Sequence, residues 1–300
     1  MDIEVKSQDL IKYIDDNMDT FSKGQKLIAN FIINHYDKAA FMTAAKLGNI
    51  VGVSESTVVR FAIELGYDGY PKLQKALQEL IKSKLTAVQR IEVSSNRINE
   101  ENVLKSVLHS DLEKIKLTME EINIDEFNTI VEKILKANRI YILGVRSSAP
   151  LASFLGFYFN LMFDNVRLVH TTSVSEMFEQ IIRVKKDDLV IGISFPRYSK
   201  RTIKAMQFVK SQGATVIAIT DSLESPVAKS ADYSLIARSD MASFVDSLVA
   251  PLSVINALIV AVGMRLKDDV YGIFEKLEKI WDEYQVYEKY DNIEAIRKID

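Results

Sequence analysis

The sequence contains 300 residues, of which 48% are hydrophobic and 26% are charged. This balance is typical of a folded protein with more than one domain and excludes a disordered or fibrous chain. The formal net charge of −3 gives the whole chain no basic character of the kind that nucleic-acid-binding proteins show. With no cysteine and three histidines, the sequence excludes disulfides, thiolate zinc sites and a cysteine nucleophile, and we expect no metal and no other cofactor.

Two segments bear on where the protein acts. Residues 1–9 are charged and lack the apolar core of a secretory signal, so we expect a cytoplasmic protein. The uncharged stretch Ser247–Met264 is of borderline length for a membrane span, but it contains Pro251, Ser253 and Asn256. We interpret it as a buried core helix or a dimer-interface helix, and we expect no membrane partner.

The first 80 residues show only helical periodicity. Ser22 and Gln25 have the spacing of a capping box, which begins a helix. A second helix is predicted around Thr43–Val51, where Gly52 suits its left-handed C-cap and Ser54 suits the N-cap of a third helix. Helix, short glycine turn and helix is the layout of a DNA-binding helix-turn-helix, and equally that of an ordinary helical hairpin.

The third helix carries the candidate DNA-reading residues. Its apolar residues recur at the spacing of a core-facing stripe: Val58, Phe61, Ala62 and Leu65. The opposite face is short and polar near its N-terminus, as in a recognition helix that enters the major groove. The candidate DNA contacts are Lys46, Ser54, Glu55, Ser56, Thr57, Val59 and Arg60. Arg60 suits a guanine or a phosphate, Val59 suits a thymine methyl, and the serines suit phosphates, whereas the alternative is a merely solvated face.

Charge is unevenly distributed along this region. Residues 42–90 hold seven basic and four acidic side chains, while residues 1–41 hold five basic and seven acidic ones. Basic charge is therefore concentrated around and after the third helix, which favours a local nucleic-acid footprint.

The same region resembles a known DNA-binding domain. The segments Gly52–Phe61, Leu65–Tyr67 and Gly69–Leu73, together with Gln25–Ala29 and Ala39–Phe41 upstream, resemble the N-terminal domain of RpiR-type bacterial transcriptional regulators over about residues 20–78. The resemblance implies binding to double-stranded DNA. Because symmetric oligomers bind symmetric sites, we expect a homodimer or homotetramer on a pseudo-palindromic operator.

The middle of the chain alternates short β-branched runs with longer segments. The predicted strands are Arg139–Leu143, Val166–Val169, Leu189–Ile193, Thr215–Ile219 and Tyr233–Ile236. Strands that alternate with helix-length segments predict a five-stranded parallel sheet in an α/β/α sandwich. The fold class is thus α/β with an all-α N-terminal domain: a helix-turn-helix domain at 1–80, a helical linker at 81–125, and the sandwich with C-terminal helices at 126–300.

Three predicted strand ends carry turns rich in hydroxyl groups: Gly144–Pro150, Ser194–Thr202 and Thr220–Pro226. Taken singly, each turn has the pattern of an ordinary helix cap. Because the carboxyl ends of parallel strands meet at one edge of the sheet, the three turns are expected to converge there. Hydroxyls, backbone amides and arginines together suit an anion such as phosphate.

This region resembles a phosphosugar-binding domain. Ile142–Gly144 with Ser148, Gly192–Ser194, Gly213–Asp221 and Ser225–Asp232 resemble the SIS (sugar isomerase) domain. The resemblance implies a sugar phosphate or sugar acid as effector, with phosphate ligands at Ser148, Ser194, Ser199 and Thr202. The full candidate ligand set is Gly144, Ser147, Ser148, Ser194, Arg197, Ser199 and Thr202.

The sequence departs from the SIS pattern in two places. The first strand of that pattern ends Gly-x-Gly, and Arg146 stands at the second glycine. The second turn usually reads Ser-x-Ser-Gly-x-Thr, whereas Ser194–Thr202 is three residues longer and lacks glycine. A longer loop with added arginine and tyrosine favours a more acidic ligand, or one without phosphate.

Catalysis by this domain would need a placed acid and base. The candidates near the predicted ligand edge are His170 and Glu176, and no nucleophile–base pair or P-loop is present. The sequence therefore favours a ligand-sensing regulator of carbohydrate metabolism without catalytic residues. Its SIS domains would associate through the helix around Pro251–Gly263, and its effector would shift the linker Leu80–Leu112. The alternatives are a sugar-phosphate isomerase with an accessory helical domain, and a scaffold whose helical domain binds protein.

Overall fold

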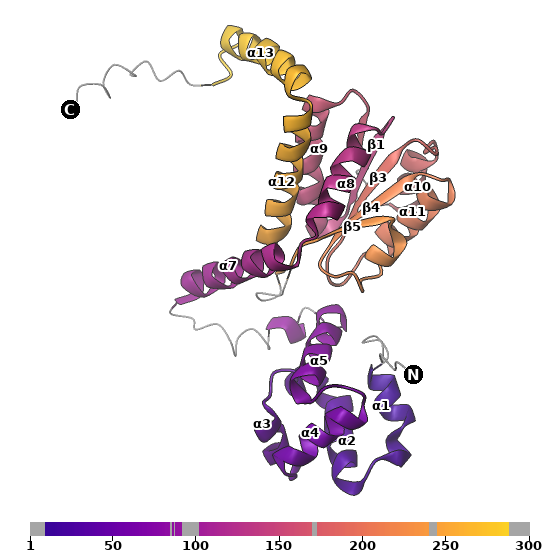
Figure 1. Ribbon diagram of the computed structural model, residues 1–300, viewed down its shortest axis with the longest axis vertical. Coiled ribbons are helices and arrows are strands. Elements are labelled where there is room, and N and C mark those ends of the chain that lie inside the picture. Colours follow the sequence, from indigo (N-terminus) through magenta and orange to yellow (C-terminus); the bar gives the residue numbers. More distant parts are fainter. Residues whose placement is uncertain are drawn as a thin grey trace, which may run out of the picture. The chain divides into compact units, whose positions relative to one another are not determined.

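The computed structural model describes residues 10–84, 86, 88–91, 102–169, 173–239 and 245–287 (Figure 1). The chain divides into two compact units. The first comprises Met1–Glu121 with Phe195–Ser199 and Ala237–Ala250, and the second comprises Ile122–Ser194, Lys200–Ile236 and Pro251–Asp300.

Helices make up the described secondary structure of the first unit. They are α1 (Leu10–Asp16), the 3₁₀ turn η1 (Met18–Thr20), α2 (Lys23–Ala39), α3 (Ala44–Val51), α4 (Glu55–Glu64), α5 (Tyr70–Lys84) and α7 (Val103–Glu121). The capping box predicted at Ser22 and Gln25 is confirmed, with both reciprocal hydrogen bonds present. Gly52 follows α3 in the left-handed conformation with a φ of 76°, and Ser54 caps α4. The predicted helix, glycine turn and helix are therefore present.

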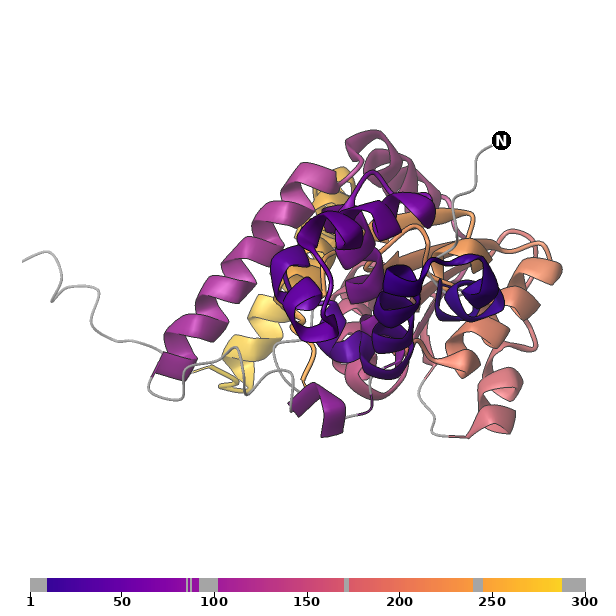
Figure 2. The same cartoon turned by 90° about the horizontal axis from the view of Figure 1, so that it is seen from below.

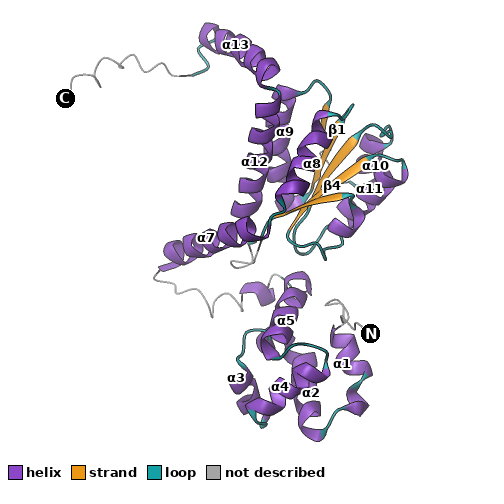
Figure 3. Ribbon diagram, in the orientation of Figure 1, coloured by secondary structure: helices purple, strands orange, loops and turns teal. Residues whose placement is uncertain are grey.

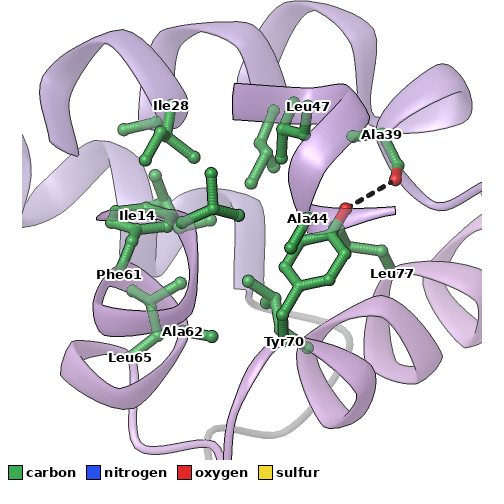
Figure 4. Packing of buried hydrophobic residues seen from close by; sticks show 14 of the residues in the cluster. Ile14, Ile28, Ala39, Ala44, Leu47, Phe61, Ala62, Leu65, Tyr70 and Leu77 are labelled. Carbon is green, nitrogen blue, oxygen red and sulfur yellow. Dashed lines mark hydrogen bonds between the residues drawn. The ribbon is translucent and has the colours of Figure 1, made fainter. Parts of the chain in front are cut away.

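The first five helices enclose one hydrophobic core (Figure 4). Each contributes fully buried side chains: Leu10 and Ile14 from α1, Ile28 and Ile32 from α2, Leu47 from α3, Val58 and Phe61 from α4, and Leu73 and Leu77 from α5. The rings of Phe21 and Phe61 meet edge to face, with centroids 5.2 Å apart. The predicted apolar stripe of the third helix thus faces this core.

Polar side chains of α5 hydrogen-bond to backbone carbonyls at and just after the C-terminus of α2. The Tyr70 hydroxyl lies 2.9 Å from the carbonyl oxygen of Met42 and 3.2 Å from that of Ala39. The amide Nε2 of Gln74 also donates to the Met42 carbonyl, at 2.8 Å. Carbonyls at a helix C-terminus have no partner within the helix, and these side chains supply one. Burial of its ring raises the pKa of Tyr70 to about 12.

Replacing Tyr70 with phenylalanine should destabilise the helical domain by about 1–2 kcal/mol, because the hydrogen bonding of its hydroxyl to the Ala39 and Met42 carbonyls is lost. Tyr67 provides the matched control. Among the described residues its buried hydroxyl has no hydrogen-bond partner, so Tyr67→Phe should leave stability unchanged or raise it. Hydrogen exchange of the α2 and α5 amides in the full chain measures both effects, and equal protection losses in the two variants would contradict the prediction.

The raised pKa gives the Tyr70 test a second readout. The ordinary tyrosine pKa is 10.0, and the folded protein holds the Tyr70 proton more tightly. The stabilisation from the neutral hydroxyl is therefore complete below pH 10 and is lost as the pH rises towards 12. The α2 amides of the wild type should lose more protection over that range than those of Tyr70→Phe.

The second unit is built on a parallel sheet flanked by helices. Its elements are α8 (Ile124–Leu135), β1 (Ile140–Gly144), η3 (Arg146–Ser148), α9 (Ala149–Met162), β2 (Val166–Val169), α10 (Val174–Ile181), β3 (Leu189–Ile193), α11 (Lys200–Ser211), β4 (Thr215–Thr220), η4 (Ala228–Ser230), β5 (Tyr233–Ile236), α12 (Val249–Arg265) and α13 (Lys267–Glu283).

The predicted α/β/α sandwich is confirmed. The five strands are all parallel in the order β2-β1-β3-β4-β5. Helices α8, α9 and α12 lie on one side of the sheet, and α10 and α11 lie on the other (Figure 3). Strand β1 begins and ends one residue later than predicted, so Gly144 is its last residue. Strand β4 continues one residue further than predicted, to Thr220.

Helix α8 covers the edge strand β5. The Glu126 carboxylate accepts a hydrogen bond from the backbone N–H of Ser234 at 2.8 Å. On the same pair of elements, the Lys133 ammonium lies 5.8 Å from the centroid of the Tyr233 ring. A side chain from α8 thus takes one of the hydrogen-bonding positions that an additional strand would use.

The prediction of a helix between β4 and β5 is wrong. The Ser225 hydroxyl accepts from the backbone N–H of Ala228, as a cap would, but only the 3₁₀ turn Ala228–Ser230 follows. The Ser230 hydroxyl donates to the Pro226 carbonyl at 2.8 Å. Such local bonds between side chains and backbone compete with a regular helix.

Helix α12 contains most of the apolar stretch considered above as a membrane span. Its buried residues are Ala250, Pro251, Val254, Ile255, Leu258, Ile259 and Val262. In the described ranges no single helix has the length and hydropathy needed to cross a bilayer. Helices α12 and α13 are long and apolar enough only when they are taken together, and the chain bends by 99° at their junction.

Candidate functional site

The N-terminus of α4 gathers three hydroxyl groups. The Ser54 hydroxyl accepts from the backbone N–H of Thr57 at 3.3 Å and lies within 2.9 Å of the hydroxyls of both Ser56 and Thr57. A helix N-terminus carries partial positive charge, and hydroxyls beside it can donate to an anion. This end of α4 therefore suits a phosphate of the DNA backbone.

Arg60 lies one turn further along α4. Its Nε donates to the backbone carbonyl of Ser56 at 3.3 Å, and its side chain is exposed. This hydrogen bond restrains Nε. The two terminal nitrogens of the guanidinium remain the donors suited to a guanine edge or a phosphate. Local structure thus restricts the orientation of this side chain before any DNA is bound.

The candidate reading residues differ in exposure. Those on the surface are Lys46, Ser54, Glu55, Ser56 and Arg60. Thr57 and Val59 are half-buried, and Val59 packs partly against the hydrophobic core. The surface of α4 that is free to contact DNA is therefore smaller than the sequence suggested, because Thr57 and Val59 turn partly towards the protein interior. Their contact with bases stays a prediction.

Sequence reasoning missed Gly48, which sets the angle of the turn. A Cβ at this position would lie 2.7 Å from the backbone carbonyl oxygen of Val53. Helix α3 therefore approaches the turn more closely than any side chain allows. The signal was available, since a glycine inside an eight-residue helix lowers helix propensity and needs a reason.

In the second unit the strand order reverses direction between β1 and β3, where the ligand site is predicted. The chain leaves β1 for β2 on one side and leaves β3 for β4 on the other, although β1 and β3 are neighbours. In parallel sheets, ligands commonly bind beyond the carboxyl ends of the strands at such a reversal. Gly144 pairs with Ile193 in register, and Ser194 directly follows. The turns carrying Ser148 and Ser194 therefore begin side by side at this reversal.

The turn after β1 is packed tightly onto the strand. A Cβ at Gly144 would lie 2.6 Å from the carbonyl oxygen of Ser148 and 2.8 Å from the Cβ of Ala152. Ser148 is buried at the N-terminus of α9. Its backbone N–H donates to the Val145 carbonyl at 3.2 Å, and its hydroxyl does not cap the helix. The amide closes the turn, which leaves the hydroxyl as the group that suits a ligand.

The other candidate ligand residues occupy different environments. Ser147 is exposed, and Thr202 is buried in the first turn of α11. The backbone N–H of Ser194 donates to the Ile219 carbonyl at 3.2 Å, so that amide is committed to the sheet. Arg197 and Ser199 belong to the segment Phe195–Ser199, which groups with the first unit. Their place at the ligand edge stays a prediction.

In the third hydroxyl-rich turn, Thr220–Pro226, side chains hydrogen-bond to one another. The buried Thr220 hydroxyl lies 3.2 Å from the Ser225 hydroxyl and 3.3 Å from Oδ1 of Asp221. Ser225 also accepts from the backbone N–H of Ala228. These contacts order the turn at the end of β4 and take up hydroxyl groups that the sequence argument had counted as ligand donors.

Of the two residues considered for catalysis, Glu176 lies within the described part of the chain. His170 lies outside the described residues, and Glu176 is exposed in the first turn of α10. Within the part of the chain that the structure describes, no cluster of three or more His, Cys, Asp or Glu side chains has metal-binding geometry.

Comparison with known proteins accounts for both units. Residues 8–84 match the helix-turn-helix domain of the rpiR family. The chain therefore carries the helix-turn-helix domain of the rpiR family. Residues 133–261 match the SIS domain, which this RpiR-type chain carries after its helix-turn-helix domain.

Relatives of this RpiR-type chain extend over most of its length. An uncharacterized HTH-type transcriptional regulator of Caldanaerobacter subterraneus is 25% identical over 280 residues, which is 91% of this chain and 96% of the relative. Another, from Haemophilus influenzae, is 26% identical over 245 residues, or 77% of this chain and 80% of the relative.

Two solved structures share the fold. The sugar isomerase domain of an RpiR transcription factor from Sphaerobacter thermophilus is 24% identical, with a TM-score of 0.55, over 58% of this chain and 96% of that chain. The Vibrio vulnificus NanR protein complexed with ManNAc-6P is 19% identical, with a TM-score of 0.55, over 92% of this chain and 98% of that chain.

The departures of this RpiR-type chain from the SIS pattern coincide with unusual backbone. Arg146, at the second glycine of the pattern, has a φ of 56°. Arg197, in the turn that lacks the expected glycine, has a φ of 64°. Positive φ is the region where glycine is favoured and other residues are strained. The backbone at these two arginines thus adopts a conformation that glycine favours.

Gly144→Ala should destabilise the SIS domain by about 1–3 kcal/mol, because the new methyl group would overlap the Ser148 carbonyl and Ala152. Gly156→Ala in α9 is the matched control, since its nearest neighbour would be the Leu168 Cδ1 at 3.6 Å. That change should be neutral or stabilising because alanine favours a helix. Hydrogen exchange of the sheet amides distinguishes the two, and an unaffected Gly144→Ala would disprove the close packing.

Proposed function

We propose that this RpiR-type chain is a transcriptional regulator of carbohydrate metabolism that acts in the cytoplasm as a homodimer or homotetramer. In this proposal α4 binds a pseudo-palindromic operator in double-stranded DNA, and the SIS domain binds a sugar phosphate or sugar acid that modulates the binding. The observation that carries the DNA-binding part is the exposed N-terminus of α4, where three hydroxyls and the anchored Arg60 lie together.

The reversal of strand order between β1 and β3 supports the effector part of the proposal. The buried Ser148 begins α9 there, and its close approach to the strand depends on Gly144. The NanR protein of the same fold was solved with ManNAc-6P, so the fold admits a phosphosugar. Arg146 adds an exposed positive charge directly after β1, which favours a ligand with more negative charge than one phosphate.

The segment that follows β5 supports coupling to the linker. Arg238 pairs with Glu121 at the end of α7, and the backbone N–H of Arg238 donates to the Thr118 hydroxyl at 2.9 Å. A displacement at the carboxyl end of β5 would therefore act directly on α7. An effector can use this route only to the extent that it binds two arrangements of the segment with different affinity.

A second set of contacts joins the same segment to α7 and to Arg90 upstream of it. The Ser247 hydroxyl donates to Asp111 in α7 at 2.5 Å, and Asp246 accepts from the buried Arg90 at 2.6 Å. Asp111 and Arg90 both lie in the linker that the effector is proposed to shift. The contacts thus join the segment that follows β5 to residues that lead to the DNA-binding domain.

Arg60→Ala should weaken operator binding by about 1–3 kcal/mol, because one guanidinium contact to a base or phosphate is lost. Fluorescence anisotropy with a labelled operator fragment at several salt concentrations measures the change. Arg183→Ala, which removes an equally exposed arginine from the SIS domain, is the control and should leave the affinity unchanged. A wild type without salt-sensitive DNA binding would remove the regulator proposal altogether.

Ser148→Ala should lower the affinity for the effector at least about tenfold, because a hydrogen bond to a charged oxygen is lost. Isothermal titration against a panel of sugar phosphates and sugar acids provides the measurement. Basal DNA binding should persist in this variant. Wild-type affinity for the effector would show that Ser148 is not a ligand, and turnover of a panel member by the pure protein would favour a sugar-phosphate isomerase instead.

A further inference from the structure

Helix α7 presents an apolar stripe to solvent. Leu104 is 72% exposed, Leu108 and Leu112 are each 59% exposed, and Met119 is 73% exposed, while Ile115 is half-buried. At about 100° per residue, these five side chains lie within an arc of about 80° on one continuous helix (Figures 1 and 2). So concentrated an apolar surface is typical of a helix that packs against another element.

The two sides of this stripe, which we call the α7 seam, differ in what they contact. On one side, Asp111 bonds to Ser247, and Glu121 pairs with Arg238 of the same chain. On the other side, Lys105 lies near the start of α7 and Glu120 near its end, with Lys116 between them, and all three are exposed. Opposite charges at opposite ends of one flank are self-complementary when two copies of the helix run antiparallel.

We propose that the α7 seam binds the α7 seam of a second copy of this chain in antiparallel orientation. With a two-fold axis beside Leu112, Leu104 faces Met119 of the partner subunit, and Leu108 faces Ile115 of the partner subunit. Lys105 then reaches Glu120 of the partner subunit, and the same pair recurs at the other end. A parallel arrangement would set Lys105 beside apolar Val103 and Val107 of the partner subunit, so the charges select the antiparallel pairing.

This inference deepens the proposed function by naming the surface through which the regulator dimerises. It places the contact on the linker helix, next to the segment that follows β5, rather than on α12 alone. It requires neither DNA nor effector. It can therefore be tested on the protein without DNA or effector. The tests remain decisive even if the protein fails to bind an operator.

Single cysteines report the orientation directly, since the natural chain contains none. Leu112→Cys lies beside the two-fold axis and should form an intersubunit disulfide under mild oxidation. Leu104→Cys lies about 11 Å along the helix from the axis, so its two copies should be about 22 Å apart and stay uncrosslinked. Ile182→Cys, equally exposed in the SIS domain, is the control for random collision. Efficient crosslinking at residue 104 would overturn the antiparallel pairing, and none at residue 112 would overturn the seam.

Sedimentation equilibrium tests the energetics. Leu108→Asp should raise the dimer dissociation constant about 100-fold or more, because a symmetric interface contains the buried charge twice. Ile182→Asp should not change it. Leu108 is exposed within one chain, so the variant should keep the wild-type circular dichroism spectrum. A wild type that stays monomeric at micromolar concentration, or a Leu108→Asp that dimerises normally, would overturn the proposal.

Charge reversal tests the pairing of the flanks. Lys105→Glu and Glu120→Lys should each weaken the homodimer, since like charges then meet at both ends. The double variant should recover wild-type affinity, and a mixture of the two single variants should form heterodimers in preference to either homodimer. Single variants that dimerise like the wild type would show that the two flanks do not meet.

Discussion

The ligand edge of the sheet depends on the absence of a side chain at residue 144. Because a Cβ there would lie 2.6 Å from the Ser148 carbonyl, the turn that follows β1 can fold directly back onto the strand. This close return places Ser148 at the start of α9 and lets α9 cover β1 and β2 with its buried face. The position of the candidate ligand hydroxyl is therefore a consequence of backbone packing rather than of any bond that the hydroxyl itself makes.

A second constraint is that the hydroxyls of the reading helix serve the fold as well. Ser54 supplies the N-cap of α4, so a substitution there removes a capping bond together with any phosphate contact. Thr57 contributes its backbone N–H to the same cap and is half-buried. Among the candidate DNA contacts, Arg60 separates the two roles best, because its side chain is exposed and bonds only to a carbonyl one turn away.

The strands and the helix caps could be read from the sequence because their signals are local. Continuous β-branched runs have few alternatives to buried strands, and Ser22, Gly52 and Ser54 each satisfy a specific backbone requirement. The turn at Ser225 shows the limit of such signals, since the cap formed and the helix did not. A capping pattern predicts where a helix can begin, whereas its length depends on what it can pack against.

Other features of the site could not be read at all. The positive φ of Arg146 follows from the packed turn after β1, and nothing in an arginine predicts it. The half-buried state of Val59 depends on how α4 is rotated against its neighbours. The seam of α7 has the same apolar periodicity as a helix buried within its own chain, so the sequence cannot tell which copy covers it.

The contact between Glu126 and the Ser234 amide has a consequence for self-association. An edge strand with free backbone groups can recruit a strand of another molecule and extend the sheet without limit, which is a route to aggregation. At β5 an acidic side chain occupies such a position, and a strand arriving there would have to displace a carboxylate that is already hydrogen-bonded. Copies of this chain therefore have little to gain from joining edge to edge at β5, and stable association is left to helical surfaces, whose two-fold pairing closes on itself instead of growing into a fibre.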